Sequence, residues 1–257
     1  MKHIVFLVGS YYPYYSAVGK CMGNIATELE KKYKITVICE KNIVDQADRD
    51  VLNMQSIIRV TTKMHYNRIK IDEKAKKVQG INRYYWKGRL LLAKFERFIK
   101  SALSKSACDH HVIRAYMNGF ARISEPIDVI IPTCNQFESV VAALQYKSAN
   151  QNVQIIPYLF DLFADSTNIN RGKLLLKSHW KANMDYEKRM FEESTCVFHV
   201  ANWTKHIEQH FPEYRNKSFE VEHPLLVCKA ENTSASKDGK IHIVYTGVVD
   251  VAIRNPE

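Results

Sequence analysis

The chain has 257 residues, of which 46% are hydrophobic and 25% are charged. These values are ordinary for a folded globular protein and exclude a wholly disordered chain. No run of about 18 apolar residues is present, so we expect no membrane-spanning helix, and the short apolar run at the N-terminus does not match a secretory signal peptide. The six cysteines form no Cys-x-x-Cys pair, which favours a reducing cytoplasm over secretion.

The net charge of +10 is concentrated in one part of the chain. Residues 59–122 hold sixteen Lys/Arg and four Asp/Glu, a net charge of 16 − 4 = +12. The other residues hold 37 − 16 = 21 basic and 27 − 4 = 23 acidic side chains, a net charge of −2. The basic character is therefore a property of one segment and needs a local explanation.

The first predicted elements follow the order strand, helix, strand. Residues 2–9 form a continuous apolar run, which is typical of a strand buried on both faces. A polar and aromatic loop follows at 10–16, and apolar residues at helical spacing then predict a helix over about 17–32. Residues 35–39 predict a second strand. This order indicates a βαβ unit with parallel strands and a right-handed crossover.

The alternation continues along most of the chain. We expect further strands at 57–60, 128–132, 153–160, 196–200 and 219–221, and helices at 84–106, 137–146, 173–193 and 204–210. Strands that alternate with helices indicate an α/β fold with a Rossmann-like, doubly wound and mainly parallel sheet.

The composition changes near residue 231. Residues 231–239 are small and polar, as in a linker, and a new apolar strand begins at about residue 241. We therefore expect a Rossmann-like domain over 1–230, a linker over 231–239 and the start of a second domain over 240–257. Because one strand cannot form a domain, either a second domain has been lost or this strand pairs with the first sheet.

The loop after the first strand is a candidate binding site, because ligands of open α/β sheets bind at the carboxyl ends of strands, near helix N-termini. Ser16, Ala17 and Gly19 have small side chains that let the backbone lie close to a sugar or phosphate. The same residues also suit a simple turn between a strand and a helix. Neither a G-x-G-x-x-G nor a Walker A motif is present, which disfavours the NAD and ATP folds that carry them.

Three segments together carry a family pattern. The loop reads Ser-Ala-x-Gly-x-Cys over 16–21, ahead of the helical run 25–29. A strand and helix at 197–205 lead to Glu-His-Pro-Leu at 222–225, and Val-Tyr-Thr-Gly at 244–247 precedes Arg254. In order and spacing these segments resemble family 4 glycosyltransferases of the GT-B fold, most closely their polysaccharide-assembly members.

The resemblance implies a retaining enzyme that transfers a sugar from a nucleotide-sugar donor to a glycan or lipid-linked acceptor, in polysaccharide or capsule biosynthesis. It implies no cofactor and no catalytic metal. The first domain would hold the acceptor and the second the donor, so Ser16, Ala17, Gly19 and Asn135 become candidate substrate-binding residues. On the donor side, Gly247 and Arg254 would face the donor diphosphate.

Asp161 is the candidate catalytic residue, because it stands near the position where the family often has a histidine at the end of a strand. It could equally be a loop acid or a helix cap, and Asn135 could equally belong to a turn. The paired glutamates with which the family binds the donor sugar belong to the second domain. The resemblance therefore implies that this chain alone is inactive.

Other functions remain open at this point. The chain could be a stand-alone acceptor- or membrane-binding module, or a subunit completed by a separate chain that carries the donor domain. It could also be a fragment of a sugar-nucleotide 2-epimerase, which shares the GT-B architecture.

The segment 84–106 predicts a long basic helix with an apolar face. Lys94, Arg97 and Lys100 lie around that face, and such a helix can bind the inner face of an anionic membrane. Alternatively, the apolar face lies in the core and the charges are solvated. A nucleic-acid partner is disfavoured because no recognition motif accompanies the charge.

His206 and His210 lie four residues apart on a predicted helix, as metal ligands can. The sequence offers no evident third ligand. We therefore expect an ordinary surface pair and no metal site.

Overall fold

The computed structural model describes residues 1–170 and 173–224, except for the side chain of Asn135. The expected linker at 231–239 and the segment 240–257, with Gly247 and Arg254, lie outside the described residues. The described residues therefore all belong to the part of the chain that was expected to form the first domain.

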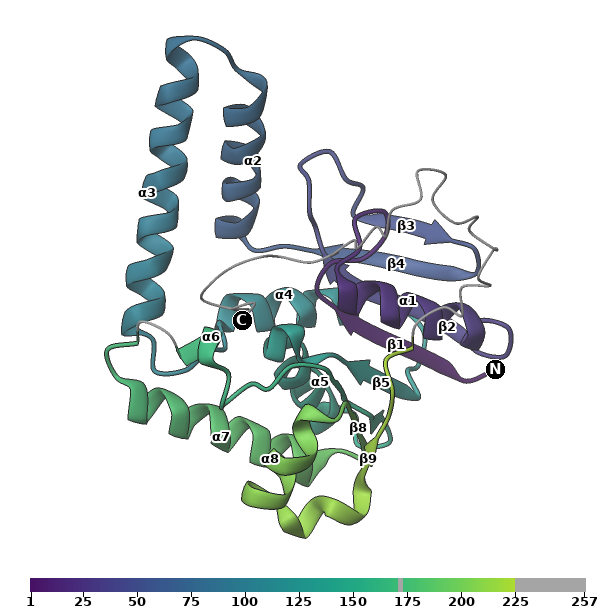
Figure 1. The fold of residues 1–257 in the computed structure, drawn as a ribbon. Helices are drawn as coiled ribbons and strands as arrows, with labels where there is room; N and C mark the ends of the chain where they lie inside the picture. Colours follow the sequence, from purple (N-terminus) through teal and green to yellow (C-terminus); the bar gives the residue numbers. More distant parts are fainter. Residues whose placement is uncertain (171–172, 225–257) are drawn as a thin grey trace, which may run out of the picture. The chain divides into compact units, whose positions relative to one another are not determined.

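A six-stranded sheet forms the centre of the fold (Figure 1). Its strand order is β3-β4-β2-β1-β5-β6. Every neighbouring pair is parallel except β3 and β4. The strands are β1 (His3–Val8), β2 (Lys34–Glu40), β3 (Arg49–Leu52), β4 (Gln55–Val60), β5 (Val129–Pro132) and β6 (Gln154–Ile155). This topology confirms the predicted α/β fold with a mainly parallel sheet.

A second, three-stranded parallel sheet contains β7 (Tyr158–Leu159), β8 (Val197–His199) and β9 (Ser218–Glu220). The prediction of a single strand at 153–160 is therefore wrong, since this segment forms β6 in the first sheet and β7 in the second. The division falls at Pro157, which has no backbone N–H to donate to a ladder. The sheets still meet there, because Thr133 after β5 forms a parallel bridge with Tyr158.

Eight α-helices and two 3₁₀-helices connect the strands within the described residues. They are α1 (Ala17–Leu29), α2 (Lys63–Lys77), α3 (Ile81–Leu103), α4 (His110–Phe120), α5 (Phe137–Ala149), α6 (Thr167–Asn170), α7 (Leu176–Glu193), α8 (Asn202–His210), η1 (Cys134–Gln136) and η2 (Pro212–Lys217). Helices α1, α4 and α5 pack against the strands of the six-stranded sheet. Every residue of β1 is buried, which agrees with its continuous apolar sequence.

Helices α2 and α3 form a hairpin that projects from the sheet (Figure 1). The two helices pack against each other, and the Trp86 ring lies under the ammonium of Lys74, 4.6 Å from its centroid. Of all residues in these two helices, which the structure describes in full, only Ile69, Ala75 and Ala102 are buried. The hairpin is therefore held mainly by contacts between its own two helices.

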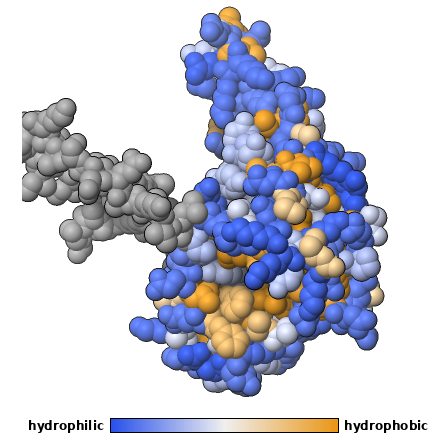
Figure 2. All heavy atoms as spheres, turned by 90° about the vertical axis from the view of Figure 1, so that its right-hand side faces the viewer, coloured by the Kyte–Doolittle hydropathy of each residue, from blue (hydrophilic) through white to orange (hydrophobic). Residues whose placement is uncertain are grey.

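The apolar face of α3 lies in solvent. Leu91, Phe95 and Phe98 are 68%, 59% and 60% exposed, so the alternative of a core helix with a solvated basic face is wrong. In the described part of the chain, no helix has both the length and the apolar character needed to cross a bilayer. Hydrophilic side chains cover most of the face seen in Figure 2, including much of the hairpin.

Candidate functional site

The carboxyl ends of several strands meet at one edge of the sheets. Leu7 of β1 is in register with Pro132 of β5, and the next amide, of Thr133, donates to the Leu7 carbonyl at 3.1 Å. The bridge from Thr133 to Tyr158 adds the end of β7. The loops that hold Ser16, Asn135 and Asp161 therefore all leave from this edge, where ligands of open α/β sheets bind.

The loop after β1 begins α1 with a tight turn. Ser16 is the N-cap, and its Oγ accepts a hydrogen bond from the Gly19 amide at 3.0 Å. A Cβ atom at Gly19 would lie 2.0 Å from the Ser10 carbonyl oxygen, so only glycine fits there. Ser16 and Gly19 therefore have structural roles, whereas Ala17 is exposed at the edge.

Asp161 follows β7 and is held through its backbone. Its carbonyl accepts hydrogen bonds from the Cys134 thiol and from Trp203 Nε1, both at 3.2 Å. Burial raises the pKa of Cys134 to about 12, so the thiol keeps the proton that it donates. These bonds join the loops after β5 and β7 and leave Asp161 exposed at the edge. Asn135 lies in η1, next to Cys134.

A cavity of about 1860 Å³ lies between this edge and the α2–α3 hairpin. Glu40, Thr61 and Gln136, at or just beyond the ends of β2, β4 and β5, line it on the side of the sheet. The first residues of α4 and α5 also line it, and helix N-termini favour anions. The hairpin supplies the opposite wall.

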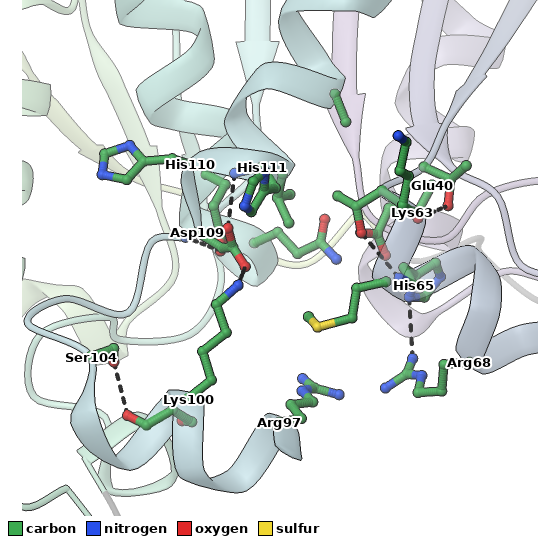
Figure 3. A pocket seen from close by; sticks show the side chains of 18 of the residues that line it. Glu40, Lys63, His65, Arg68, Arg97, Lys100, Ser104, Asp109, His110 and His111 are labelled. Atoms are coloured by element: carbon green, nitrogen blue, oxygen red, sulfur yellow. Dashed lines mark hydrogen bonds and ion pairs between the residues drawn. The ribbon is translucent and has the colours of Figure 1, made fainter. Parts of the chain in front are cut away.

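The cavity is strongly basic. Ten Lys/Arg and four Asp/Glu line it, a net charge of 10 − 4 = +6. Figure 3 shows Arg68 of α2 and Arg97 of α3 pointing toward one another across the space. Arg68 also donates to His65 Nδ1 at 3.3 Å, and Lys100 pairs with Asp109 at 3.0 Å. The ten cations are Lys63, Arg68, Lys70, Lys74, Arg89, Arg97, Lys100, Lys105, Arg114 and Lys173.

Two carboxyl groups in the cavity have pKa values displaced in opposite directions. Burial raises the pKa of Glu138, even though its Oε1 accepts the Asp109 amide at 3.0 Å. Burial also acts on Asp109, but the His111 amide and the Lys100 ammonium outweigh it and lower the Asp109 pKa. The site therefore combines an anion, Asp109, with a carboxyl group, Glu138, that holds its proton more tightly than an exposed glutamate does.

The predicted site residues and the cavity only partly coincide. Arg97 and Lys100 line the cavity, whereas Lys94, Ser16, Ala17, Gly19 and Asp161 are not among its lining residues. The residues that sequence reasoning missed come mainly from α2 and from the start of α4, neither of which it identified. The charge excess over 59–122 was the available signal, since nine of the ten cations fall in that segment and Lys173 alone lies outside it.

The expected surface pair of His206 and His210 is wrong. His206 is only 4% exposed, and the structure supplies the third polar group that the sequence did not reveal. His206 Nδ1 lies 2.8 Å from Asp165 Oδ2, and His210 Nε2 lies 3.5 Å from the same oxygen. Asp165 could not be found from the sequence, since it is 41 residues from His206 and only the fold joins them.

No family model and no curated protein matches the chain. Among solved structures it is similar to sucrose-phosphate synthase from Thermosynechococcus elongatus, with 11% identity, a TM-score of 0.48 and coverage of 86% of this chain and 48% of that one. UGT2 of Phytolacca americana, complexed with UDP-2-fluoro-glucose and pterostilbene, shows 9% identity, a TM-score of 0.45 and coverage of 88% and 54%. The OtsA apo structure shows 10% identity, a TM-score of 0.44 and coverage of 83% and 43%. The chain therefore spans about half the length of these proteins.

Proposed function

We propose that this chain provides the acceptor-binding half of a GT-B glycosyltransferase of the family 4 type. The observation that carries the proposal is the basic cavity at the carboxyl edge of the parallel sheet. The sequence resemblance supports the same assignment independently, because its first two segments fall on the loop after β1 and on the region from β8 to residue 224. The reaction would move a sugar from a nucleotide donor to an acceptor in polysaccharide or capsule assembly.

The charge of the cavity favours an acceptor that carries phosphate. A net charge of +6 and two helix N-termini face one space, and Arg68 and Arg97 have the planar, forked donors that suit phosphate oxygens. A lipid-linked diphosphate fits this chemistry better than a neutral glycan. Asp161, exposed at the same edge, is our candidate for the group that contacts the reacting hydroxyl.

The donor would bind to a second domain. In this proposal residues 1–230 are the acceptor domain, 231–239 a linker and 240–257 the start of a nucleotide-sugar domain in which Gly247 and Arg254 face the donor diphosphate. A separate chain could complete that domain. Because sugar transfer needs both substrates held together, residues 1–230 on their own should bind acceptor but consume no nucleotide sugar.

Binding of an anionic lipid head group tests the acceptor assignment. The full chain should bind farnesyl diphosphate, measured by calorimetry, and should not bind farnesol. Arg68→Gln/Arg97→Gln should weaken binding by about tenfold or more, since each lost charge-assisted hydrogen bond contributes roughly 1.5–3 kcal/mol. The matched control is Lys76→Gln/Lys77→Gln, which removes two exposed cations of α2 outside the cavity. Equal affinities of the two double variants for farnesyl diphosphate would contradict the acceptor assignment.

We further propose that the apolar face of α3 binds the membrane that holds the acceptor. This apolar stripe, formed by Leu91, Phe95 and Phe98, is exposed, and Lys87 and Lys94 are exposed on the same helix. Apolar residues bounded by cations are the pattern of an interfacial helix, and each cation contributes roughly 1 kcal/mol near an anionic surface. A cavity on one side of α3 and a bilayer on the other would bring a lipid-linked acceptor to the site.

Vesicle co-sedimentation tests this second proposal. Leu91→Ser/Phe95→Ser should lower affinity for phosphatidylglycerol vesicles by about tenfold or more, given the roughly 1.5–3 kcal/mol for burying each side chain. Lys94→Glu should weaken binding less, and the remaining binding should fall as salt rises. Val51→Ser/Met54→Ser is the control, because these residues are 67% exposed and lie away from the hairpin in the β3–β4 region. Unchanged binding by the α3 variants would contradict the proposal.

A further inference from the structure

Four residues from three parts of the chain meet beneath α8. His206 and His210 come from α8, Glu187 from α7, and Asp165 from the loop before α6. One ligand atom from each of Asp165, His206 and His210 lies within 4.8 Å of the others. This cluster lies outside the basic cavity and serves no step of the proposed transfer.

The two nitrogens of His206 face different carboxylates. Its Nε2 lies 2.7 Å from Glu187 Oε2, and its Nδ1 lies 2.8 Å from Asp165 Oδ2. Glu187 is fully buried, and its other oxygen accepts the Ala164 amide at 2.8 Å. An Nε2–H bond to Glu187 fixes the orientation of the ring and leaves Nδ1 directed at Asp165. A buried carboxylate behind a histidine is the usual outer partner of a metal-binding imidazole.

The other two groups are similarly oriented. Asp165 Oδ1 accepts a hydrogen bond from Trp180 Nε1 at 2.7 Å, which leaves Oδ2 directed at the histidines. His210 Nε2 lies 3.5 Å from that Oδ2, and the Trp180 ring packs against the His210 ring at 6.1 Å. Three ligand atoms therefore converge, each oriented by the contacts around it.

We propose that Asp165, His206 and His210 bind a divalent zinc-class ion, with Glu187 and Trp180 as its outer hydrogen-bonding partners. Two imidazoles and one carboxylate suit zinc, which takes such ligands at about 2.0–2.2 Å in a tetrahedron. Neighbouring ligand atoms of such a tetrahedron lie about 3.3 Å apart, close to the distances of 2.8 and 3.5 Å found here. The hydrogen between His206 Nδ1 and Asp165 leaves as a proton when the ion binds.

The site is open on one side. The side chains of Asp165 and His210 are 35% and 20% exposed, so an ion can enter and water can take the fourth position. The ion would fasten the loop that carries Asp161 and Asp165 to α8. Its role is therefore structural, as it holds the carboxyl-edge loop against the helix that follows β8.

Metal binding by the full chain tests the proposal, with zinc followed by calorimetry and cobalt by its visible absorption. After removal of metal with chelator, the wild type should bind one Zn²⁺, and Co²⁺ should give the intense bands of a tetrahedral site. His210→Gln and Asp165→Asn should each lower zinc affinity by at least about 100-fold and abolish those bands. Glu187→Gln should lower it by roughly 10–100-fold, as is usual for an outer partner.

Two comparisons keep the result unambiguous. His110→Gln is the matched control, because it removes an exposed histidine outside the cluster and should leave zinc affinity unchanged. His210→Gln is the principal variant, since His210 is partly exposed and its loss empties no buried position. Zinc should raise the Tm of the wild type and not of His210→Gln. No zinc bound by the folded wild type, or equal affinity in wild type and His210→Gln, would overturn the proposal.

Discussion

The sheet and the α2–α3 hairpin use apolar side chains in opposite ways. In β1 all six residues are buried, whereas α3 has 23 residues and buries only Ala102. Both segments are rich in apolar residues, yet the strand is covered on both faces and the helix on one side only. An apolar sequence therefore predicts that a segment contacts another surface in both regions. It does not predict whether that surface belongs to the same chain or to a partner.

This difference has an energetic consequence. Burying a large apolar side chain contributes roughly 1.5–3 kcal/mol, so the sheet supplies most of the stability of the fold. The hairpin gains little from its exposed stripe, and its ion pairs, such as Lys76 with Asp72, are exposed and therefore weak. We expect the sheet to be sensitive to substitution and the hairpin to be tolerant, with its apolar stripe reserved for a partner surface.

Truncating a phenylalanine in each region should give the largest contrast. Phe6 in β1 is fully buried and Phe95 in α3 is 59% exposed. Phe6→Ala should lower the free energy of unfolding by about 3–5 kcal/mol, whereas Phe95→Ala should change it by less than about 0.5 kcal/mol. Urea denaturation of both variants measures this. Comparable losses would mean that the apolar stripe is buried and that the membrane proposal is wrong.

Removing one partner of an ion pair should give an intermediate contrast. The Arg59 guanidinium is fully buried and donates to Asp50 at 2.9 Å. It donates also to the Tyr12 and Ala47 carbonyls. Asp50→Asn leaves a buried cation without its anion and should lower the free energy of unfolding by about 1–2 kcal/mol. The loss is smaller than for a fully buried pair because water reaches Asp50. Asp72→Asn in α2 should have no measurable effect, since both partners of that pair are exposed.

The Asp50 contrast should depend on pH. The hydrogen bond from Arg59 lowers the Asp50 pKa, so the folded state favours the ionised form. The stabilisation is therefore present above the unfolded pKa of about 3.9 and is lost as the pH falls through the lower folded value. Urea denaturation at pH 7 and in acid should show the difference between wild type and Asp50→Asn shrinking in acid. If the stability difference between wild type and Asp50→Asn did not depend on pH, it would arise from packing and not from the charge of Asp50.

Sequence reasoning found the buried elements better than the exposed ones. The apolar runs at β1, β2 and β5 predicted their strands because burial on both faces leaves few polar residues in them. Helix α2 was missed because its sequence is mostly polar and it buries only Ile69 and Ala75. The loops at the carboxyl edge were predicted from strand order alone. The cavity was not, because its far wall is the hairpin, and no local pattern predicts where the hairpin packs.

Long-range pairing explains the remaining misses. Asp165 and His206 are distant in sequence, and so are Glu138 and Asp109, whose contact joins α5 to the start of α4. Each pair is created by the packing of elements, so neither residue carries a local signal of its role. The basic segment 59–122 was visible as a charge excess, but its meaning depended on which of its side chains face a cavity and which face solvent.

Two helical glycines, one in each region, give the smallest contrast and the sharpest test of the packing. A Cβ atom at Gly119 in α4 would lie 2.7 Å from Ile38 Cγ2 and 3.0 Å from Val60 Cγ1, whereas one at Gly88 in α3 would meet no atom of the described residues within 4 Å. Gly88→Ala should therefore stabilise α3 by about 0.5–1 kcal/mol, because alanine loses less backbone entropy on folding. The same change at Gly119 gains that propensity but overpacks the sheet, which costs roughly 1–3 kcal/mol, so the net effect should be destabilising.

Urea denaturation measures the sign of the stability change at Gly119, and hydrogen exchange of the α3 amides measures the gain at Gly88 even if the hairpin opens separately from the sheet. Stabilisation by both substitutions would mean that α4 does not pack against β2 and β4 as closely as described, and destabilisation by both would mean that the middle of α3 is covered.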